Sequence, residues 1–125
     1  MSGATEHNTP DIDSRVRQVV AAALDRKAGD LRVLYLGEVS DFTEYFLVCS
    51  GGNQRQVQAI ADGILRKLRD HKVRPLGVEG YNHGRWILID FGSFIAHIFD
   101  EQTRGVYKLE KLWADGTDVT GTFGS

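Results

Sequence analysis

The chain has 125 residues, of which 42% are hydrophobic and 26% are charged, and its formal net charge at pH 7 is −2. This length and composition predict one globular domain with a modest hydrophobic core. The slightly negative total excludes the overall basic field that is typical of nucleic-acid-binding proteins.

The charges are unevenly distributed along the chain. Between Asn53 and Pro75 there are 6 basic and 2 acidic residues, a net charge of +4, whereas Glu79 to Asp118 holds 4 basic and 7 acidic residues, a net charge of −3. The acidic C-terminal part could suit a basic partner, because complementary charge accelerates association. Two solvated faces of opposite sign would give the same pattern, so charge alone leaves both interpretations open.

Cysteine content and hydropathy predict the compartment. The single cysteine, Cys49, cannot form a disulfide within the chain, which fits a reducing environment. The N-terminus lacks the pattern of a signal peptide, and no apolar run approaches the ~20 residues that a membrane span needs. We therefore expect a cytoplasmic protein without membrane contact.

The N-terminal part predicts a tail and then a helix. Residues 1–11 are polar and indicate a mobile tail. Asp13 or Ser14 is a suitable N-cap for the helix that follows, and Gly29 suits its end. One face of this helix has apolar residues at helical spacing: Val16, Val19, Val20, Ala23 and Leu24.

Two strands and a second helix are expected next. Residues 31–36 and 44–49 read as strands, and the second is apolar enough to be buried on both faces. Asn53 is the expected N-cap of the next helix, with Gln56 at the capping-box position three residues on. The apolar stripe of that helix consists of Val57, Ile60, Ala61, Ile64, Leu65 and Leu68.

The remaining elements alternate less regularly. Residues 73–78 predict a short strand, and its proline favours a place at the edge of the sheet. Residues 86–91 and 94–99 predict two strands joined by a tight hairpin at Gly92-Ser93. Residues 101–113 indicate a short helical segment.

These elements predict an α/β fold with the order α-β-β-α-β-β-β-α. A mixed sheet of about five strands with helices packed on it follows from this order. We place the domain at residues 12–115 and expect the glycine- and threonine-rich residues 116–125 to form a flexible C-terminal tail.

One candidate for chemistry is the turn Ser50-Gly51-Gly52, which precedes a helix and could cradle a phosphate on its backbone N–H groups. The turn lacks both the P-loop pattern and the G-x-G-x-x-G pattern, so a tight turn between strand and helix is the alternative. Nucleotidyltransferases also have a glycine turn before a helix, but they need paired carboxylates that hold magnesium. The only Asp-x-Asp here, Asp11-Ile12-Asp13, precedes the first helix, so we expect neither a metal nor a cofactor.

Histidines and aromatic residues give weaker signals. No histidine pair has zinc-ligand spacing. His97 interrupts an apolar strand, and it is either a half-buried histidine bonded to backbone or carboxylate, or a polar contact at a partner surface. Trp86, Tyr107 and Trp113 are interface candidates because aromatic side chains dominate binding hot spots. Trp113 also belongs to a helical stripe and could be core.

Several segments resemble one known family in order along the chain. They are Ser40-x-x-Thr43-Glu44-Tyr45-Phe46-x-x-Cys49-Ser50-Gly51, Arg55-Gln56-Val57-x-x-Ile60-Ala61-Asp62, Glu79-Gly80, Trp86, Asp90-Phe91-Gly92, His97-Ile98-Phe99 and Arg104-x-x-Tyr107-x-Leu109-Glu110-Lys111-Leu112-Trp113. From about Val16 to Asp115 the chain resembles the ribosomal silencing factor family, also called RsfS or Iojap-like.

The resemblance implies a function without catalysis. Members of the family bind ribosomal protein fourteen of the large ribosomal subunit, on the face that meets the small subunit. Their bulk obstructs subunit joining and lowers translation when nutrients are scarce. The family fold is a mixed α/β sheet related to nucleotidyltransferases without their active site, and members are often dimeric, so a homodimer is also expected.

The resemblance also implies site residues. The partner-contacting positions of the family correspond to Trp86, Asp90, Phe91, His97 and Tyr107. One position departs from the family pattern, because this chain has Glu44 where the family usually has aspartate. A nucleotidyltransferase-like or nucleotide-binding role at Ser50-Gly51-Gly52 remains the alternative function.

Overall fold

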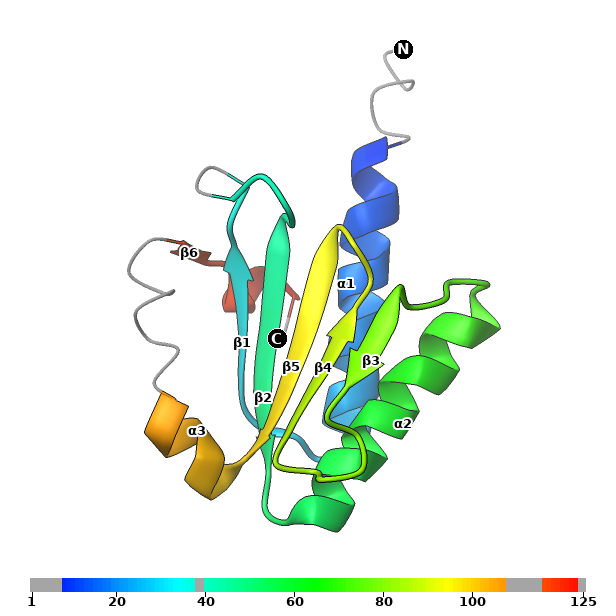
Figure 1. Ribbon diagram of the computed structural model, residues 1–125. Coiled ribbons are helices and arrows are strands. Elements are labelled where there is room, and N and C mark those ends of the chain that lie inside the picture. The colour runs from blue at the N-terminus through cyan, green and yellow to red at the C-terminus, as the bar shows by residue number, and fades with distance from the viewer. Residues whose placement is uncertain (1–7, 38–39, 108–115, 124–125) are drawn as a thin grey trace.

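Figure 1 shows one twisted sheet with α1 and α2 packed against one of its faces. The structure is a computed structural model that describes residues 8–37, 40–107 and 116–123. The helices are α1 (Asn8–Asp25), α2 (Gln54–Asp70), α3 (Glu101–Tyr107) and α5 (Thr120–Phe123), and the strands are β1 (Gly29–Tyr35), β2 (Tyr45–Gly51), β3 (Gly77–Glu79), β4 (Trp86–Asp90), β5 (Phe94–Asp100) and β6 (Thr117–Asp118).

The sheet is mixed and has six strands in the order β3-β4-β5-β2-β1-β6. The two central strands, β2 and β5, pair in parallel, and every other pair of neighbours in this order is antiparallel. The predicted α/β fold with a mixed sheet is therefore confirmed. The strand count is higher than expected because β6 forms in the C-terminal segment.

The core lies between the sheet and the two long helices. All but one of the predicted α2 stripe residues are fully buried, and Leu65 is half-buried beside them. From α1, four valine and alanine residues of the predicted stripe join this core, whereas Leu24 is 43% exposed. Amphipathic periodicity thus identified the packed face of both helices.

The junction between β2 and α2 is closed by side-chain caps. The Asn53 side chain accepts a hydrogen bond from the Gln56 N–H (2.9 Å), as the capping box predicted. The Gln56 side chain reaches back one residue further than the standard box and accepts from the Gly52 N–H (2.7 Å). Its amide also donates to the carbonyl oxygens of Arg26 and Lys27, so α2 begins against the end of α1.

Parts of both segments that were expected to be tails belong to helices or strands. Helix α1 begins at Asn8, so residues 8–11 are helical rather than mobile. Pro10 is tolerated there because the first turn of a helix needs no backbone N–H donor from it. At the other end, β6 pairs with β1, and the Phe123 ring lies 5.6 Å from the Tyr45 ring. The prediction of a flexible segment from residue 116 was therefore wrong for residues 117–123, because a low apolar content hid the few apolar side chains that pack.

Two further boundaries differ from the prediction. The edge strand is confirmed at β3, but it spans only Gly77–Glu79, after the proline. Helix α3 is described as far as Tyr107, and the rest of the predicted helical segment, residues 108–113 with Trp113, lies outside the described residues. Among the helices that the structure describes, none combines the length and apolarity that crossing a membrane requires.

Candidate partner-binding face

The face of the sheet that points away from α1 and α2, here called the front face, carries its own apolar surface. Side chains alternate along each strand, and residues paired across strands share a face. Register and alternation place Leu34, Phe46, Val48, Trp86, Leu88, Ile95, His97 and Phe99 on this face. None of them belongs to the core that α1 and α2 cover.

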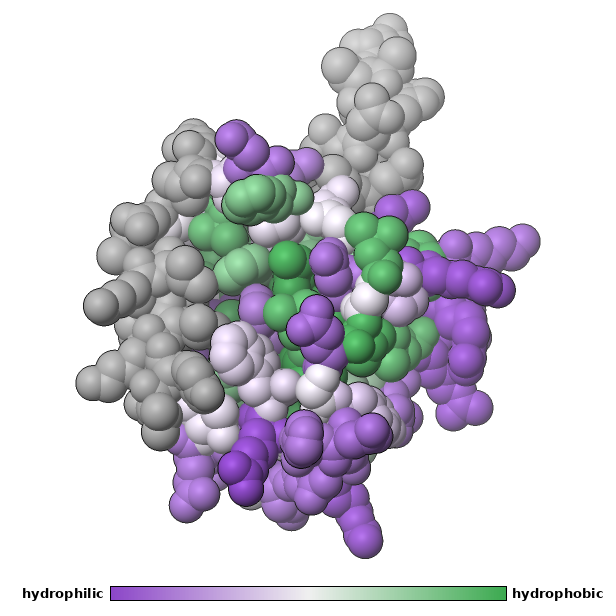
Figure 2. All heavy atoms as spheres, in the orientation of Figure 1, coloured by the Kyte–Doolittle hydropathy of each residue, from purple (hydrophilic) through white to green (hydrophobic). Residues whose placement is uncertain are grey.

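The front face is only partly covered. Leu34, Val48 and Phe99 have no exposed surface. Four others remain half-buried: Phe46, Trp86, Leu88 and Ile95. In Figure 2, which views this face, green apolar surface lies in the middle and purple hydrophilic residues lie along the lower and right-hand rim. A half-covered apolar centre within a polar rim is the usual form of a protein-binding surface.

Trp86 is part of an aromatic cluster on the front face. As the first residue of β4 it is paired with Phe99 of β5, and the two rings stack at a centroid distance of 4.9 Å. The indole Nε1–H donates to Nδ1 of His97 at 3.1 Å. On the other side of His97, the Phe46 ring packs edge-on at 4.6 Å. The structure therefore brings Trp86 and His97 together, as two of the predicted site residues.

His97 is more deeply buried than the sequence suggested, with 5% of its surface exposed. Its partner is the Trp86 indole, and not the backbone group or carboxylate of the first of the two interpretations. Burial lowers the pKa of His97 from 6.5 to about 4, so the ring is neutral at physiological pH. Because Nδ1 accepts the hydrogen bond from the indole N–H, the proton of the neutral imidazole is on Nε2.

Asp90 and Phe91 lie on opposite sides of the sheet. Asp90 is on the front face, opposite Ile95, and its carboxylate accepts a hydrogen bond from the Gly92 N–H (2.8 Å). Phe91 is 8% exposed and stacks on Phe94 within the core that the helices cover. The structure therefore does not bring Phe91 to the front face, because adjacent positions of an extended chain point in opposite directions.

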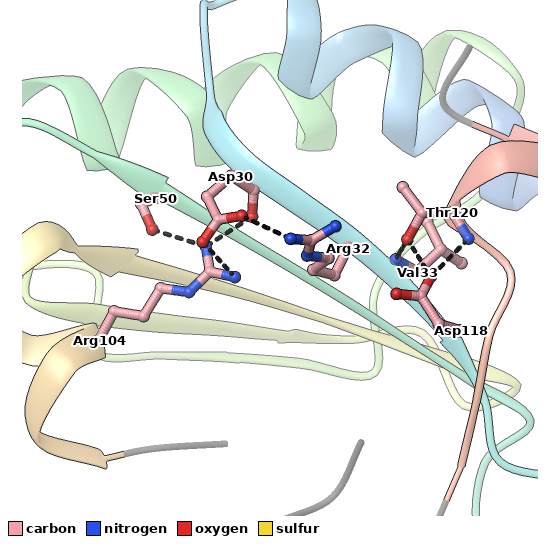
Figure 3. Close-up of polar contacts among 7 residues, drawn as sticks. All are labelled: Asp30, Arg32, Val33, Ser50, Arg104, Asp118 and Thr120. Atoms are coloured by element: carbon pink, nitrogen blue, oxygen red, sulfur yellow. Dashed lines mark hydrogen bonds and ion pairs between the residues drawn. The ribbon is translucent and has the colours of Figure 1, made fainter. Parts of the chain in front are cut away.

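Tyr107 is the last residue of α3, and its side chain lies outside the described residues. The helix itself is held by Arg104, which the sequence did not single out except within the family string. Figure 3 shows the Arg104 guanidinium donating to the Asp30 carbonyl (2.6 Å) and to the Ser50 hydroxyl (2.8 Å), and paired with the Asp30 carboxylate at 3.2 Å. Planar guanidinium donors suit such a multiple contact, so Arg104 fixes α3 against β1 and β2.

The loop before Trp86 is fastened to α2. The Gln58 side chain donates to the Tyr81 carbonyl (2.8 Å), and the Tyr81 hydroxyl donates to the Asp62 carboxylate (2.8 Å). Gly80 has φ = +80°, and a Cβ there would overlap the Trp86 carbonyl oxygen. Only glycine fits such a position without strain. The entry of the chain into β4, and hence the place of Trp86, is set by these contacts.

At the turn Ser50-Gly51-Gly52, two polar groups are already bonded within the fold. The Ser50 hydroxyl accepts from Arg104, and the Gly52 N–H is bonded to Gln56. A Cβ on Gly51 would lie 2.9 Å from the Val57 nitrogen, so the glycine is explained by close packing on α2. Within the described residues, no group of three or more His, Cys, Asp or Glu side chains is placed to hold a metal ion. Burial raises the pKa of Cys49 to about 12, which keeps its thiol protonated.

Comparison with known proteins assigns the family. A family model described as "Ribosomal silencing factor during starvation" matches residues 9–123. The chain belongs to the ribosomal silencing factor family. The predicted resemblance is thereby confirmed, and this family is named for silencing and not for a catalytic activity.

Relatives of this chain are found in bacteria and in mouse. The chain is 35% identical to ribosomal silencing factor RsfS of Bacillus subtilis over 111 residues, which cover 89% of this chain and 94% of the relative. It is 28% identical over 114 residues to a mouse protein named "Mitochondrial assembly of ribosomal large subunit protein 1", of which the match covers 49%.

Solved structures agree with the fold. A crystal structure of a Chromobacterium violaceum protein is similar with a TM-score of 0.79 and 29% identity, and the match covers 81% of this chain and 84% of that one. A Bacillus halodurans structure has a TM-score of 0.71 and 36% identity, with 77% and 90% covered.

Proposed function

We propose that this protein binds ribosomal protein fourteen of the large ribosomal subunit through its front face, and that its bulk then prevents the small subunit from joining. The observation that carries the proposal is the family match over residues 9–123. The name of the mouse relative, which refers to assembly of the ribosomal large subunit, supports the choice of subunit. The action would be steric and would need no catalytic group.

The geometry of the front face supports this partner. Trp86 supplies a large, half-buried aromatic side chain beside apolar neighbours, and such anchors carry most of the energy of protein interfaces. Glu79 and Asp90 share this face with Leu88 and Ile95, to which they are respectively paired. A basic protein surface would complement these carboxylates and be steered toward them.

The first test is co-sedimentation of the purified protein with isolated large subunits and with assembled ribosomes. We expect the protein to pellet with free large subunits and to be excluded from assembled ribosomes, since the joined small subunit would occupy the same space. Equal recovery with both particles, or none with either, would contradict the proposal.

Trp86→Ala tests where the partner binds. Removing a central anchor should weaken binding by roughly 2 kcal/mol, which is about thirty-fold in affinity. The melting temperature should change less, because part of the ring is exposed. Phe42→Ala is a matched control, because that ring is 90% exposed in the β1–β2 loop and lies outside the front face. A Trp86→Ala protein that binds normally would remove Trp86 from the site.

A further inference from the structure

His97 is a polar residue surrounded by apolar ones on the front face. Its paired neighbours across the sheet are Leu88 on β4 and Val48 on β2, and the Phe46 ring packs against it. Nδ1 has the Trp86 indole as its donor, but no described residue offers an acceptor to the buried Nε2 atom. A buried N–H without an acceptor destabilises a fold, so an apolar side chain would be more stable at this position.

What His97 provides in place of this folding stability is its contact with Trp86. Stacking on Phe99 holds the plane of the indole, with an angle of 28° between the two rings. Stacking does not by itself choose between the two indole orientations that share this plane, because a turn of about 180° about the Cβ–Cγ bond (χ2) leaves the ring in the same plane. The hydrogen bond from Nε1 to His97 is directional and therefore favours the orientation in which Nε1 points at His97.

We propose that His97 is a positioning residue, which holds the Trp86 indole in the orientation that the partner meets and does so at a cost to folding stability. The part that concerns the partner rests on the proposed function. The orientation of the indole is a property of the free protein and does not depend on it. With 5% of its surface exposed, His97 would act through Trp86 and would not touch the partner itself.

The test compares one substitution that removes the hydrogen-bond acceptor for Trp86 with one that keeps it. His97→Leu removes the acceptor and the unsatisfied donor together. His97→Asn keeps an acceptor, because the asparagine Oδ1 can lie where Nδ1 lies in histidine, but it buries a polar amide. A merely structural role predicts that binding follows stability through this series. The positioning role predicts that stability and binding rank the two variants in opposite orders.

Three measurements are made on each variant: the melting temperature, the hydrogen-exchange rate of the Trp86 indole N–H by NMR, and the affinity for large subunits. Trp86→Phe identifies the indole signal by removing it. For His97→Leu we expect a melting temperature at or above that of the wild type, indole exchange about ten-fold faster, and affinity about ten-fold weaker, since a lost directional hydrogen bond frees the ring. For His97→Asn we expect a lower melting temperature, slow exchange, and recovery of most of the affinity lost in His97→Leu.

A double-mutant cycle separates positioning from other effects. In the Trp86→Phe background there is no indole N–H, so adding His97→Leu should not weaken binding further. Additive losses would overturn the proposal, as would a His97→Leu protein with wild-type exchange and affinity. If the wild-type protein does not bind large subunits, the proposed function fails, and the exchange rates of the free variants still decide whether His97 orients Trp86.

Discussion

A single hydrogen bond between Trp86 and His97 determines which nitrogen of the imidazole carries the proton. The sequence indicated both residues, but it could not show that they contact each other, because the pairing depends on the register of β4 against β5. The same limit applies to Phe91, which follows Asp90 directly in the family string yet faces the core. A motif places residues in order along the chain, whereas strand alternation decides which face each one occupies.

Burial of neutral His97 makes folding stability depend on pH. In the folded protein its pKa is about 4, against 6.5 in an unfolded chain, so between these values the unfolded state binds more protons. The share of folding stability that depends on neutral His97 is fully present above pH 6.5. It is lost as the pH decreases toward 4, and amounts to roughly 3 kcal/mol. Urea unfolding over pH 4–7 should show this loss in the wild type, and His97→Leu should lack that share of it. The same slope in both proteins would contradict a buried neutral histidine.

Gly80 and Gly77 provide a matched pair around β3. Gly80 has a positive φ and no room for a Cβ beside the Trp86 carbonyl, whereas a Cβ on Gly77 would meet nothing within 4 Å. Gly80→Ala should cost at least about 2 kcal/mol, from backbone strain and the clash together. Gly77→Ala should stay within about 0.5 kcal/mol, as expected for an open surface position. Thermal unfolding of both variants checks this, and equal effects would mean that the loop is not held as described.

At the level of elements, strong amphipathic periodicity was sufficient to predict a helix and its packed face. The low apolar content of the C-terminal segment, in contrast, was misleading. The stripe and cap of α2 appear in the structure as predicted, since six apolar positions and Asn53 all indicate the same register. Strand β6 and helix α5 could not be predicted from a segment rich in glycine and threonine. Their packing depends on β1, because the Val33 N–H donates to the Thr120 hydroxyl (2.9 Å) and the Val119 N–H donates to the Val33 carbonyl (2.8 Å).

Phe123 tests whether the C-terminal segment belongs to the fold. Its ring packs on Tyr45, and the Arg17 guanidinium lies 5.0 Å above it. Phe123→Ala should lower the free energy of unfolding by roughly 1–3 kcal/mol, less than the ~3–5 kcal/mol for a fully buried phenylalanine. Phe42→Ala, which removes an exposed ring, should change it by less than about 0.5 kcal/mol. Chemical denaturation measures both. A Phe123→Ala protein as stable as the wild type would show that the segment contributes nothing.

At the level of the whole molecule, the two faces of the sheet differ in what covers them. Helices α1 and α2 cover one face and form the core with it, which accounts for the stability of the domain. The front face keeps half-buried apolar side chains and two carboxylates, features that a stable core does not require. Figure 1 shows that neither long helix covers this face. The fold class followed from the order of elements, whereas the difference in coverage between the two faces became visible only in the structure.

Light scattering of mixed ribosomal subunits tests the central claim most directly, because joined particles scatter more than separate ones. Large subunits preincubated with saturating wild-type protein should fail to join small subunits, and the scattering increase should be lost. With Trp86→Ala at the same concentration, most of the increase should return, since about thirty-fold weaker binding leaves many large subunits free. Unchanged joining in the presence of saturating wild-type protein would contradict the account.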